Sequence, residues 1–359
     1  MTERKLATIQ IISELHLIEC ADKIEYAKVM GWQVVVKKSE FVIGDLCIFC
    51  EIDSLMPEKP EFEFLRAKKF RVKSIKLRGQ ISQGLVLPLS VLGEQVSAGI
   101  KRDCVSGKSN PIGLDVSKMI GVIKYEPPTP PGSGGVALGD FPSFLIPKTD
   151  EIRIQSAIKV IEEIRGKDVY LAEKEDGTSF TGYHWKFKKS GETEEQHYYG
   201  VCSRNRELKD EGSDVYWKIS HKYNIENKLK QYYELHGINL AVQGEICGGI
   251  IQSNPLRLKQ DQLFLFNIYN IDEHKYLDYA AFKLAAQELD LPTVRILGEC
   301  KFNFTLEELL EIAKGKYPGT NNNREGIVIR PVNEAYSETL AGRMSFKVIN
   351  NDYLLKDEK

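Results

Sequence analysis

The stretch Val169-Tyr-Leu-Ala-Glu-Lys174-Glu-Asp-Gly177 joins a short apolar segment to a lysine, three acids and a glycine. The run Val169–Ala172 predicts a buried strand, and Gly177 predicts the turn that follows it. A lysine at such a strand end can point into a cleft, where its amine can attack phosphorus once its pKa is lowered. By itself the Lys-x-Asp-Gly pattern also fits a solvated turn, so the other segments of the chain decide between the two.

The surrounding sequence mixes helices and strands. Ser156–Arg165 has apolar residues at helical spacing and is followed by Gly166, which suits a helix C-terminus. Thr305-Leu-Glu-Glu308 is a capping box that predicts the start of another helix, ended by Gly315. Further short strands are expected at Leu240–Gln243, Leu263–Phe266 and Gly326–Arg330. We therefore expect an α+β domain over residues 141–359.

Residues 1–125 have a different pattern. Trp32–Lys37, Asp45–Cys50 and Arg71–Leu77 are short strand candidates separated by Gly, Asp and Pro. About five such strands fit a small all-β barrel of OB type. Glu126–Gly135 is rich in Pro and Gly, which predicts a linker over residues 126–140, or alternatively a long surface loop within one domain.

Composition limits the classes of function. A chain of 359 residues allows two domains, and a net charge of −2 means that any site for a polyanion must be a local patch. No apolar run can span a bilayer, and the N-terminus lacks the apolar core of a signal peptide. Seven scattered cysteines predict free thiols in a reducing intracellular compartment, cytoplasm or nucleus. Cys47-Ile-Phe-Cys50 lacks a second ligand pair, so we expect a buried strand there rather than a zinc site.

Five later segments carry side chains suited to a nucleotide. They offer a guanidinium for phosphate or ribose (Arg204), two carboxylates beside strands (Glu245 and Glu325), an aromatic face for a base (Phe266) and a late lysine (Lys347). Each has a structural alternative: a surface carboxylate, a core aromatic residue or a solvated strand lysine. No single segment separates the two interpretations.

In this order, and together with Lys-x-Asp-Gly, these segments resemble the covalent nucleotidyltransferase superfamily of polynucleotide ligases and mRNA capping enzymes, over roughly residues 140–350. The lead-in Phe141–Gln155, Glu245-Ile-Cys-Gly248 with Ile251–Asn254, and the ending Ser345–Asn350 look like RNA ligases. DNA ligases and capping enzymes normally have a C-terminal OB domain, whereas here the β-rich module comes first. That order is similar to ATP-dependent RNA ligases of the Deinococcus and Naegleria type.

The resemblance implies a fold and a reaction. The fold is an α+β nucleotidyltransferase domain, ATP-grasp-like with antiparallel sheets and flanking helices, preceded by an OB-type barrel. Lys174 would take AMP from ATP and pass it to a 5′-phosphate RNA end, and a 3′-OH RNA end would then displace AMP. Mg²⁺ or Mn²⁺ and Lys347 would lower the pKa of Lys174 and neutralise phosphate charge.

The same resemblance implies roles for individual residues. The catalytic group comprises Lys174, Lys347 and Asp176. The ATP- and AMP-binding group comprises Glu173 (on the adenine amine), Gly177, Arg153 (on the leaving pyrophosphate), Arg204, Glu245, Phe266, Glu325, Arg330 and Lys347. The metal would be held through water by Asp176, Glu245 and Glu325. One position departs from the family: Ser345 stands where many relatives have the first lysine of Lys-x-Lys, so Arg343 or Arg330 would share the phosphate.

A basic segment lies in the N-terminal region. Seven cations and no acid occur between residues 66 and 78: Arg66, Lys68, Lys69, Arg71, Lys73, Lys76 and Arg78. Interleaved apolar residues predict a strand with its charges outside. Either the segment is a solvated edge strand protected by lysine, or it is a groove that binds RNA phosphates. We favour the RNA-binding surface because the catalytic motifs imply a nucleic-acid substrate.

These observations predict an ATP-dependent RNA ligase that acts on 5′-phosphate and 3′-OH RNA ends, including nicked duplexes, as a monomer without membrane partners. Three alternatives remain at this point: a DNA ligase, a capping guanylyltransferase that uses GTP, and a nucleic-acid-binding relative with a dead transferase site.

Overall fold

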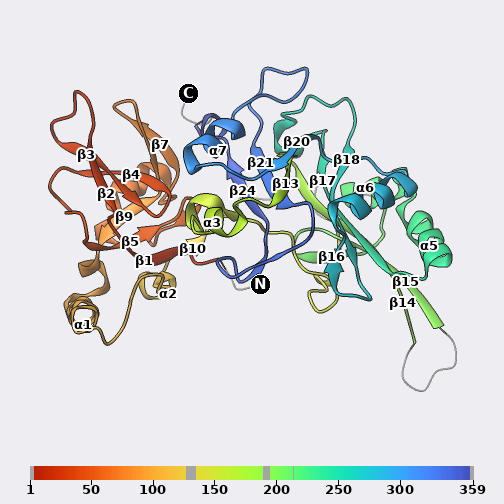
Figure 1. Cartoon of the computed structure of the whole chain (residues 1–359), viewed down its shortest axis with the longest axis horizontal. Coiled ribbons are helices and arrows are strands. Elements are labelled where there is room, and N and C mark those ends of the chain that lie inside the picture. Colours follow the sequence, from red (N-terminus) through yellow and green to blue (C-terminus); the bar gives the residue numbers. More distant parts are fainter. Residues whose placement is uncertain (1–3, 127–134, 189–194, 213, 356–359) are drawn as a thin grey trace. The chain divides into compact units, whose positions relative to one another are not determined.

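The computed structural model describes residues 4–126, 135–188, 195–212 and 214–355 (Figure 1). These residues form two compact units. The N-terminal unit comprises residues 4–126, to which residues 155–158 and 354–355 also belong. The catalytic unit comprises residues 135–154 and 159–353. Most of the proposed linker, residues 127–134, lies outside the described residues.

The N-terminal unit is built from short antiparallel strands, as expected for an OB-type fold. One sheet has the order β1-β5-β9 and another the order β2-β3-β4, while β7–β8 and β6–β10 form two-stranded pairs. The strands are β1 (Ala7–Ile11), β2 (Glu14–Leu17), β3 (Ile24–Val29), β4 (Trp32–Lys37), β5 (Leu46–Cys50), β6 (Ser54–Leu55), β7 (Ser74–Leu77), β8 (Gln80–Gln83), β9 (Leu85–Pro88) and β10 (Ile123–Lys124). Alternating burial along β3 and β4 places every second side chain in the core.

Helices also occur in this unit, which the strand pattern did not reveal. They are η1 (Pro60–Lys68), η2 (Leu89–Leu92), α1 (Glu94–Val105) and α2 (Ser117–Ile120). Phe62 of η1 and Ile120 of α2 pack into the same apolar core as Ile48 of β5. Cys47 and Cys50 are fully buried in β5 as free thiols, as expected for a strand.

The catalytic unit contains two larger sheets. The five-stranded sheet has the order β12-β24-β21-β13-β20. Its strands are β12 (Ile152–Arg153), β13 (Asp168–Lys174), β20 (Ile296–Lys301), β21 (Gly326–Pro331) and β24 (Phe346–Ile349). β13 pairs antiparallel with β20 on one side and β21 on the other, and only the β12–β24 pair in this sheet is parallel.

The second sheet has the order β11-β16-β15-β14-β17-β18-β19, with every pair antiparallel. Its strands are β11 (Ala137–Asp140), β14 (Thr178–Lys188), β15 (Glu195–Cys202), β16 (Arg206–Leu208), β17 (Leu240–Cys247), β18 (Gln262–Asn270) and β19 (Lys275–Tyr276). The chain passes from the end of β13 directly into β14, so residues 175–177 connect the two sheets.

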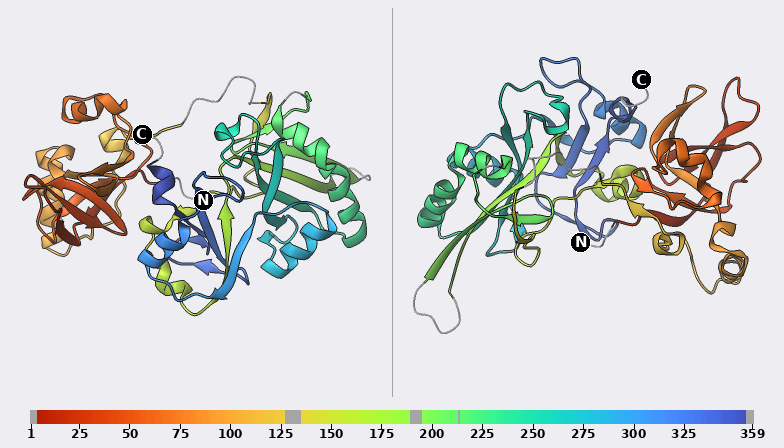
Figure 2. Two further views of the ribbon diagram at one scale, coloured as in Figure 1. Left: turned by 90° about the horizontal axis from the view of Figure 1, so that it is seen from above. Right: turned by 180° about the vertical axis from the view of Figure 1, so that it is seen from behind.

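Helices cover both sheets (Figure 2). The core of the five-stranded sheet includes residues of α3 (Val160–Ile164) and α7 (Leu306–Ala313), and that of the seven-stranded sheet includes α4 (Val215–Tyr223), α5 (Ile225–His236) and α6 (Tyr279–Glu288). Val169 and Leu171 of β13 face the first core, whereas Tyr170 and Ala172 face the second. Burial on both faces explains why the run Val169–Ala172 within this strand is continuously apolar.

The remaining elements are η3 (Ile154–Ser156), η4 (Ile251–Ser253), β22 (Tyr336–Ser337), β23 (Gly342–Arg343) and α8 (Asn351–Leu354). The capping box of Thr305 with Glu308 is present as predicted. The helix expected over Ser156–Arg165 is shorter, because α3 begins at Val160 and residues 155–158 pack with the N-terminal unit. Within the described residues, no helix is long and apolar enough to cross a membrane.

Candidate active site

Lys174 is the last residue of β13, and Glu325 immediately precedes β21, the neighbouring strand. The register pairs Lys174 with Gly326, which brings the two side chains together. Lys174 Nζ donates a hydrogen bond of 2.6 Å to Glu325 Oε2, and both side chains are only about one-fifth exposed. Of the two sequence interpretations, this ion pair in a partly buried site favours the functional one over the solvated turn.

The pKa of Lys174 lies above its ordinary value, and its lowering by a divalent cation together with Lys347 stays a prediction. Burial alone would lower this pKa, but the carboxylates of Glu325, Glu245 and Asp176 outweigh the desolvation. In the described arrangement the amine is therefore protonated at neutral pH. The amine becomes a nucleophile only when nearby cations neutralise the charge of the three carboxylates, or when the amine loses its proton to one of these carboxylates.

Two further acids surround the lysine from the other sheet and from the connecting turn. Glu245 lies on β17, and its burial, together with Glu325 and Asp176, raises its pKa to about 8. Gly177 allows the turn to approach β17, since a Cβ there would lie 2.3 Å from the carbonyl oxygen of Ile246. The glycine of Lys-x-Asp-Gly is thus needed for a close approach of backbones.

The charge of this cluster fits a divalent cation. Three carboxylates share one buried region, and such groups are normally neutralised by a cation. Among the residues that the structure describes, no three acidic, His or Cys side chains are arranged to hold a metal ion directly. Asp176, Glu245 and Glu325 can hold a divalent cation through water molecules, which agrees with their clustering and with the lack of a set of direct ligands. This binding stays a prediction.

Two more cations lie beside Lys174. Arg153 of β12 is paired in register with Lys347 of β24. The pKa of Lys347 is lowered to about 8 by burial and by the neighbouring charges of Lys174 and Arg153, which outweigh Glu151 and Asp150. The sheet therefore holds three basic side chains close enough to influence one another, as a site for phosphate oxygens requires.

A stability measurement can test the burial of Lys347. The unfolded chain keeps the Lys347 proton up to a pKa of about 10.4, whereas the folded protein releases it near pH 8. Unfolding therefore takes up a proton between these values, and its free energy rises with pH there. We expect ligand-free Lys347→Met to be more stable than wild type by about 3 kcal/mol at pH 7.

This stability difference between Lys347→Met and wild type should shrink between pH 8 and 10.5. Urea unfolding of both proteins across that range measures it. Lys301→Met is the matched control, since the side chain of Lys301 is 71% exposed. A difference for Lys347→Met that stays constant with pH would contradict the lowered pKa.

Arg204 and Phe266 lie on or next to the seven-stranded sheet. Arg204 follows β15, is half exposed and donates to Asp150, and its charge acts on Glu245. Phe266 is partly buried on β18, two residues after Phe264, which pairs with Glu245. The predicted contacts of Arg204 with phosphate or ribose and of Phe266 with a base stay predictions.

Arg330 has different partners from those expected. Its side chain is only 1% exposed, and it donates to Glu151, to the Ser345 hydroxyl and to the carbonyl of Phe266. Its charge is matched by Glu151, whose own pKa stays low despite burial because of Arg330. Arg330 thus connects Glu151, Ser345 and Phe266 through its hydrogen bonds, and its predicted role toward phosphate stays a prediction. Arg343, the other substitute considered for Ser345, pairs with Glu334.

Glu173 also differs from the prediction. Its carboxylate is 1% exposed and accepts two hydrogen bonds from Arg295, at 3.0 and 2.7 Å, and lies 3.5 Å from Arg324. Arg324 in turn donates to the last carbonyls of α7. Glu173 therefore anchors β13 to its surroundings, and its contact with the adenine amine stays a prediction.

Three contributors to the site escaped the sequence motifs. Tyr317 hydrogen-bonds to the backbone of both Lys174 and Glu325, Tyr353 donates to the Asp176 carboxylate, and Glu151 balances Arg330. The only sequence signal for Glu151 was its place in the RNA-ligase-like lead-in. The two tyrosines belong to no motif.

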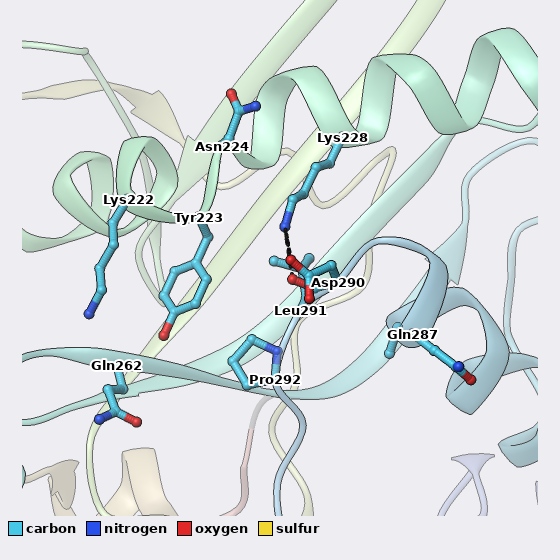
Figure 3. Close-up of a pocket in the computed structure, with 10 residues that line it drawn as sticks. Lys222, Tyr223, Asn224, Lys228, Gln262, Gln287, Asp290, Leu291 and Pro292 are labelled. Carbon is cyan, nitrogen blue, oxygen red and sulfur yellow. Dashed lines mark hydrogen bonds and ion pairs between the residues drawn. The ribbon is translucent and has the colours of Figure 1, made fainter.

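A cavity of about 660 Å³ lies elsewhere in the catalytic unit, where α4 meets α5 and α6 ends (Figure 3). Its walls include Lys222, Lys228, Gln262 and Asp290. Lys228 is occupied with Asp290 and Lys222 with the carbonyl of Asp261. None of its lining residues belongs to the acid and lysine cluster around Lys174, so we do not place the chemistry there.

The basic segment of the N-terminal unit is only partly a strand. Residues 66–68 end η1, Lys69 and Phe70 form a turn with positive φ, and β7 begins at Ser74. Arg66 pairs with Glu63, and Arg71 pairs with Asp53 and stacks on Tyr125. Lys68, Lys69, Lys76 and Arg78 are exposed, with Lys76 and Arg78 at the β7–β8 turn. These four are the cations of the predicted set that are best placed for RNA.

Comparisons with known proteins agree with this geometry. A family model described as RNA ligase matches residues 167–349, and one described as an OB-fold domain matches residues 6–89. Three solved structures of Naegleria gruberi RNA ligase are similar to this chain, each at 34% identity and a TM-score of 0.81. Two are mutants, one with ATP and Mn and the other with AMP and Mn, and each match covers 98% of this chain and 99% of that chain. The third is the ligase with PPi, and its match covers 99% of both chains. No curated protein matches the chain. The resemblance seen in the sequence is confirmed, and the chain belongs to the RNA ligase family.

Proposed function

We propose that this protein joins a 3′-OH RNA end to a 5′-phosphate RNA end at the expense of ATP, through lysyl-AMP and RNA-adenylate. The observation that carries the proposal is the Lys174–Glu325 pair at 2.6 Å inside a cluster of acids and cations. The solved relatives hold ATP, which is the cosubstrate of the first step, PPi, which is its leaving group, and AMP, which is the nucleotide transferred and finally released.

In the first step the Lys174 amine attacks the α-phosphorus of ATP. A P–N bond forms, the bond to the bridging oxygen breaks, and pyrophosphate leaves. Glu325 Oε2, already bound to Nζ, is placed to accept the proton that Lys174 must lose. Lys347 and Arg153 supply positive charge for the phosphate oxygens.

The second and third steps transfer the same AMP group. A 5′-phosphate oxygen of RNA attacks the phosphorus of lysyl-AMP and releases the lysine, and a 3′-OH then attacks the RNA phosphate and releases AMP. Asp176, Glu245 and Glu325 would hold Mg²⁺ or Mn²⁺ through water. The ion would supply charge neutralisation at the phosphates, and it fits because the three carboxylates are clustered and partly buried.

We further propose a division of labour along the chain. Residues 141–359 together with β11 would form the catalytic domain and residues 1–125 an RNA-binding domain, and β11 shortens the linker expected at 126–140. Its substrates would include nicked duplexes, and the enzyme would act as a monomer. All seven cysteines are free, and Cys20 and Cys300 are exposed, which supports a reducing intracellular compartment.

Labelling and sealing assays test the proposal together. The protein is incubated with Mg²⁺ or Mn²⁺ and α-labelled ATP or GTP, and then with nicked duplexes whose 3′-OH strand ends in RNA or DNA. We expect an acid-labile protein–AMP adduct from ATP alone, its loss with EDTA, and preferential sealing of RNA ends. Equal sealing of DNA ends would indicate a DNA ligase, labelling by GTP a capping enzyme, and no labelling a dead relative.

The exposed cations of the β7–β8 turn yield a prediction about RNA binding. The logarithm of the RNA affinity falls linearly with the logarithm of the salt concentration, and removing a cation that binds one RNA phosphate reduces that slope by about one. We expect Lys76→Ala with Arg78→Ala to weaken RNA binding several-fold and to reduce this slope by about one to two. A salt titration of fluorescent RNA measures both quantities.

ATP labelling of this double variant should stay at the wild-type rate, since the nucleotide residues lie in the other unit. Arg66→Ala with Arg71→Ala is the matched control, because these two cations belong to the same basic segment but lie outside the β7–β8 pair. An unchanged salt slope in the Lys76 and Arg78 variant would remove the β7–β8 turn from the RNA surface.

A further inference from the structure

Tyr317 lies between α7 and β21, outside every motif of the family. Its side chain is almost fully buried at 1% exposure. The hydroxyl donates a hydrogen bond of 3.1 Å to the carbonyl oxygen of Lys174 and accepts one of 3.1 Å from the backbone N–H of Glu325. One hydroxyl thus contacts the main chain of both members of the 2.6 Å ion pair.

These two hydrogen bonds lie at the end of the β13–β21 pair. The ladder between β13 and β21 ends with Lys174 opposite Gly326, and the chain then turns away at Glu175. The hydroxyl joins the two strands at this last pair, where backbone pairing stops. It therefore fixes the separation of the two strand ends that carry the nucleophile and its proton acceptor.

The segment that carries Tyr317 is itself held on several sides. The N–H of Tyr317 bonds to the carbonyl of Asn322, and the Thr320 hydroxyl bonds to the carbonyl of Tyr317. The Asn322 amide donates a hydrogen bond of 2.7 Å to the carbonyl of Pro255. Because this loop is held by hydrogen bonds, the Tyr317 hydroxyl has a fixed position and can keep the two strand ends in place.

We infer that Tyr317 is a positioning residue for lysyl-AMP formation, acting through Lys174 and Glu325. This inference rests on the proposed function. Lys174 is the nucleophile of the first step and the leaving group of the second, so its placement matters most when lysyl-AMP forms. A small misplacement of a nucleophile lowers the rate of attack by up to about a hundredfold, whereas sealing of RNA that already carries AMP does not need the lysine as a nucleophile.

Tyr317→Phe in the full-length protein tests the inference, because it removes one oxygen and leaves the ring. We expect kcat for lysyl-AMP formation to fall about ten- to a hundredfold with KM for ATP within about twofold. Sealing of pre-adenylated RNA should fall by less than about threefold. A purely structural role would reduce the folded fraction and lower both reactions equally.

Tyr199→Phe is the matched control. The Tyr199 hydroxyl bonds to the hydroxyl of Ser220 in α4 at 2.6 Å, so this variant also loses one tyrosine hydrogen bond. Both reactions should keep their wild-type rates in this variant. If Tyr317→Phe does not fold, Asn322→Ala loosens the same loop, and it should show a smaller fall confined to the first step.

A Tyr317→Phe or Asn322→Ala protein with wild-type kcat for labelling overturns the inference and leaves the proposed function intact. Equal losses in labelling and in sealing of pre-adenylated RNA overturn it as well. A wild-type protein that forms no lysyl-AMP overturns the proposed function, and the inference with it.

Discussion

Lys174→Ala is expected to abolish the protein–AMP adduct and to lower ATP-dependent sealing at least about a thousandfold, since no other group can form the covalent bond. The neighbouring cations cannot replace it. Arg153 is a guanidinium, which does not deprotonate in proteins, and Lys347 lies on another strand, β24.

Sealing of pre-adenylated RNA by the Lys174→Ala protein distinguishes the final sealing step from lysyl-AMP formation. In that reaction the nucleophile is the RNA 3′-OH, so a measurable rate should remain. Lys167→Ala is the matched control, because Lys167 is exposed and directly precedes β13, at the other end of the strand that carries Lys174. Labelling of the Lys174→Ala protein by ATP would refute the assignment of the nucleophile.

The second large effect is expected from Arg330→Met. This substitution leaves Glu151 buried without its guanidinium, and breaking such a pair costs about 3–5 kcal/mol of unfolding free energy. The side chain of Arg330 is 1% and that of Glu151 13% exposed, so solvent screens the pair little. Calorimetry of the ligand-free protein should show a clearly lower unfolding temperature.

A second substitution distinguishes charge from packing in this pair. Adding Glu151→Gln to Arg330→Met should restore part of the stability, since the uncompensated charge disappears. Arg165→Met is the control, because Arg165 pairs with Glu162 at the surface, and no measurable change is expected. A destabilisation of the double variant equal to the sum of the two single effects would show that the two residues do not interact.

The sequence predicted the parts of the fold that depend on local pattern. The run Val169–Ala172 of β13 is apolar because both of its faces are buried, and the capping box of Thr305 and Glu308 marks the start of α7. The OB-type strands and the RNA ligase family were also recognised and are confirmed. The helix predicted to begin at Ser156 is shorter than expected, because residues 155–158 belong to the N-terminal unit and do not continue the helix.

The site was predicted less completely, for a physical reason. Glu173 and Arg330 were assigned to the nucleotide from the resemblance, and the structure buries both in ion pairs, with Arg295 and Glu151. Burial depends on strands far apart in the chain and is not visible in a motif. Tyr317 escaped for the same reason, since 143 residues separate it from Lys174.

The pairing of β13 on both sides has a consequence for hydrogen exchange. A strand with hydrogen-bonded neighbours on each edge and apolar contacts on each face can release its amide protons only when much of the unit opens. The amides of Tyr170, Leu171 and Ala172 should therefore be among the slowest in the protein to exchange with deuterium. Those of β11, which pairs only with β16, should exchange early. The nucleophile thus stands at the end of one of the most persistent strands of the molecule, and its backbone should keep its place during every turnover.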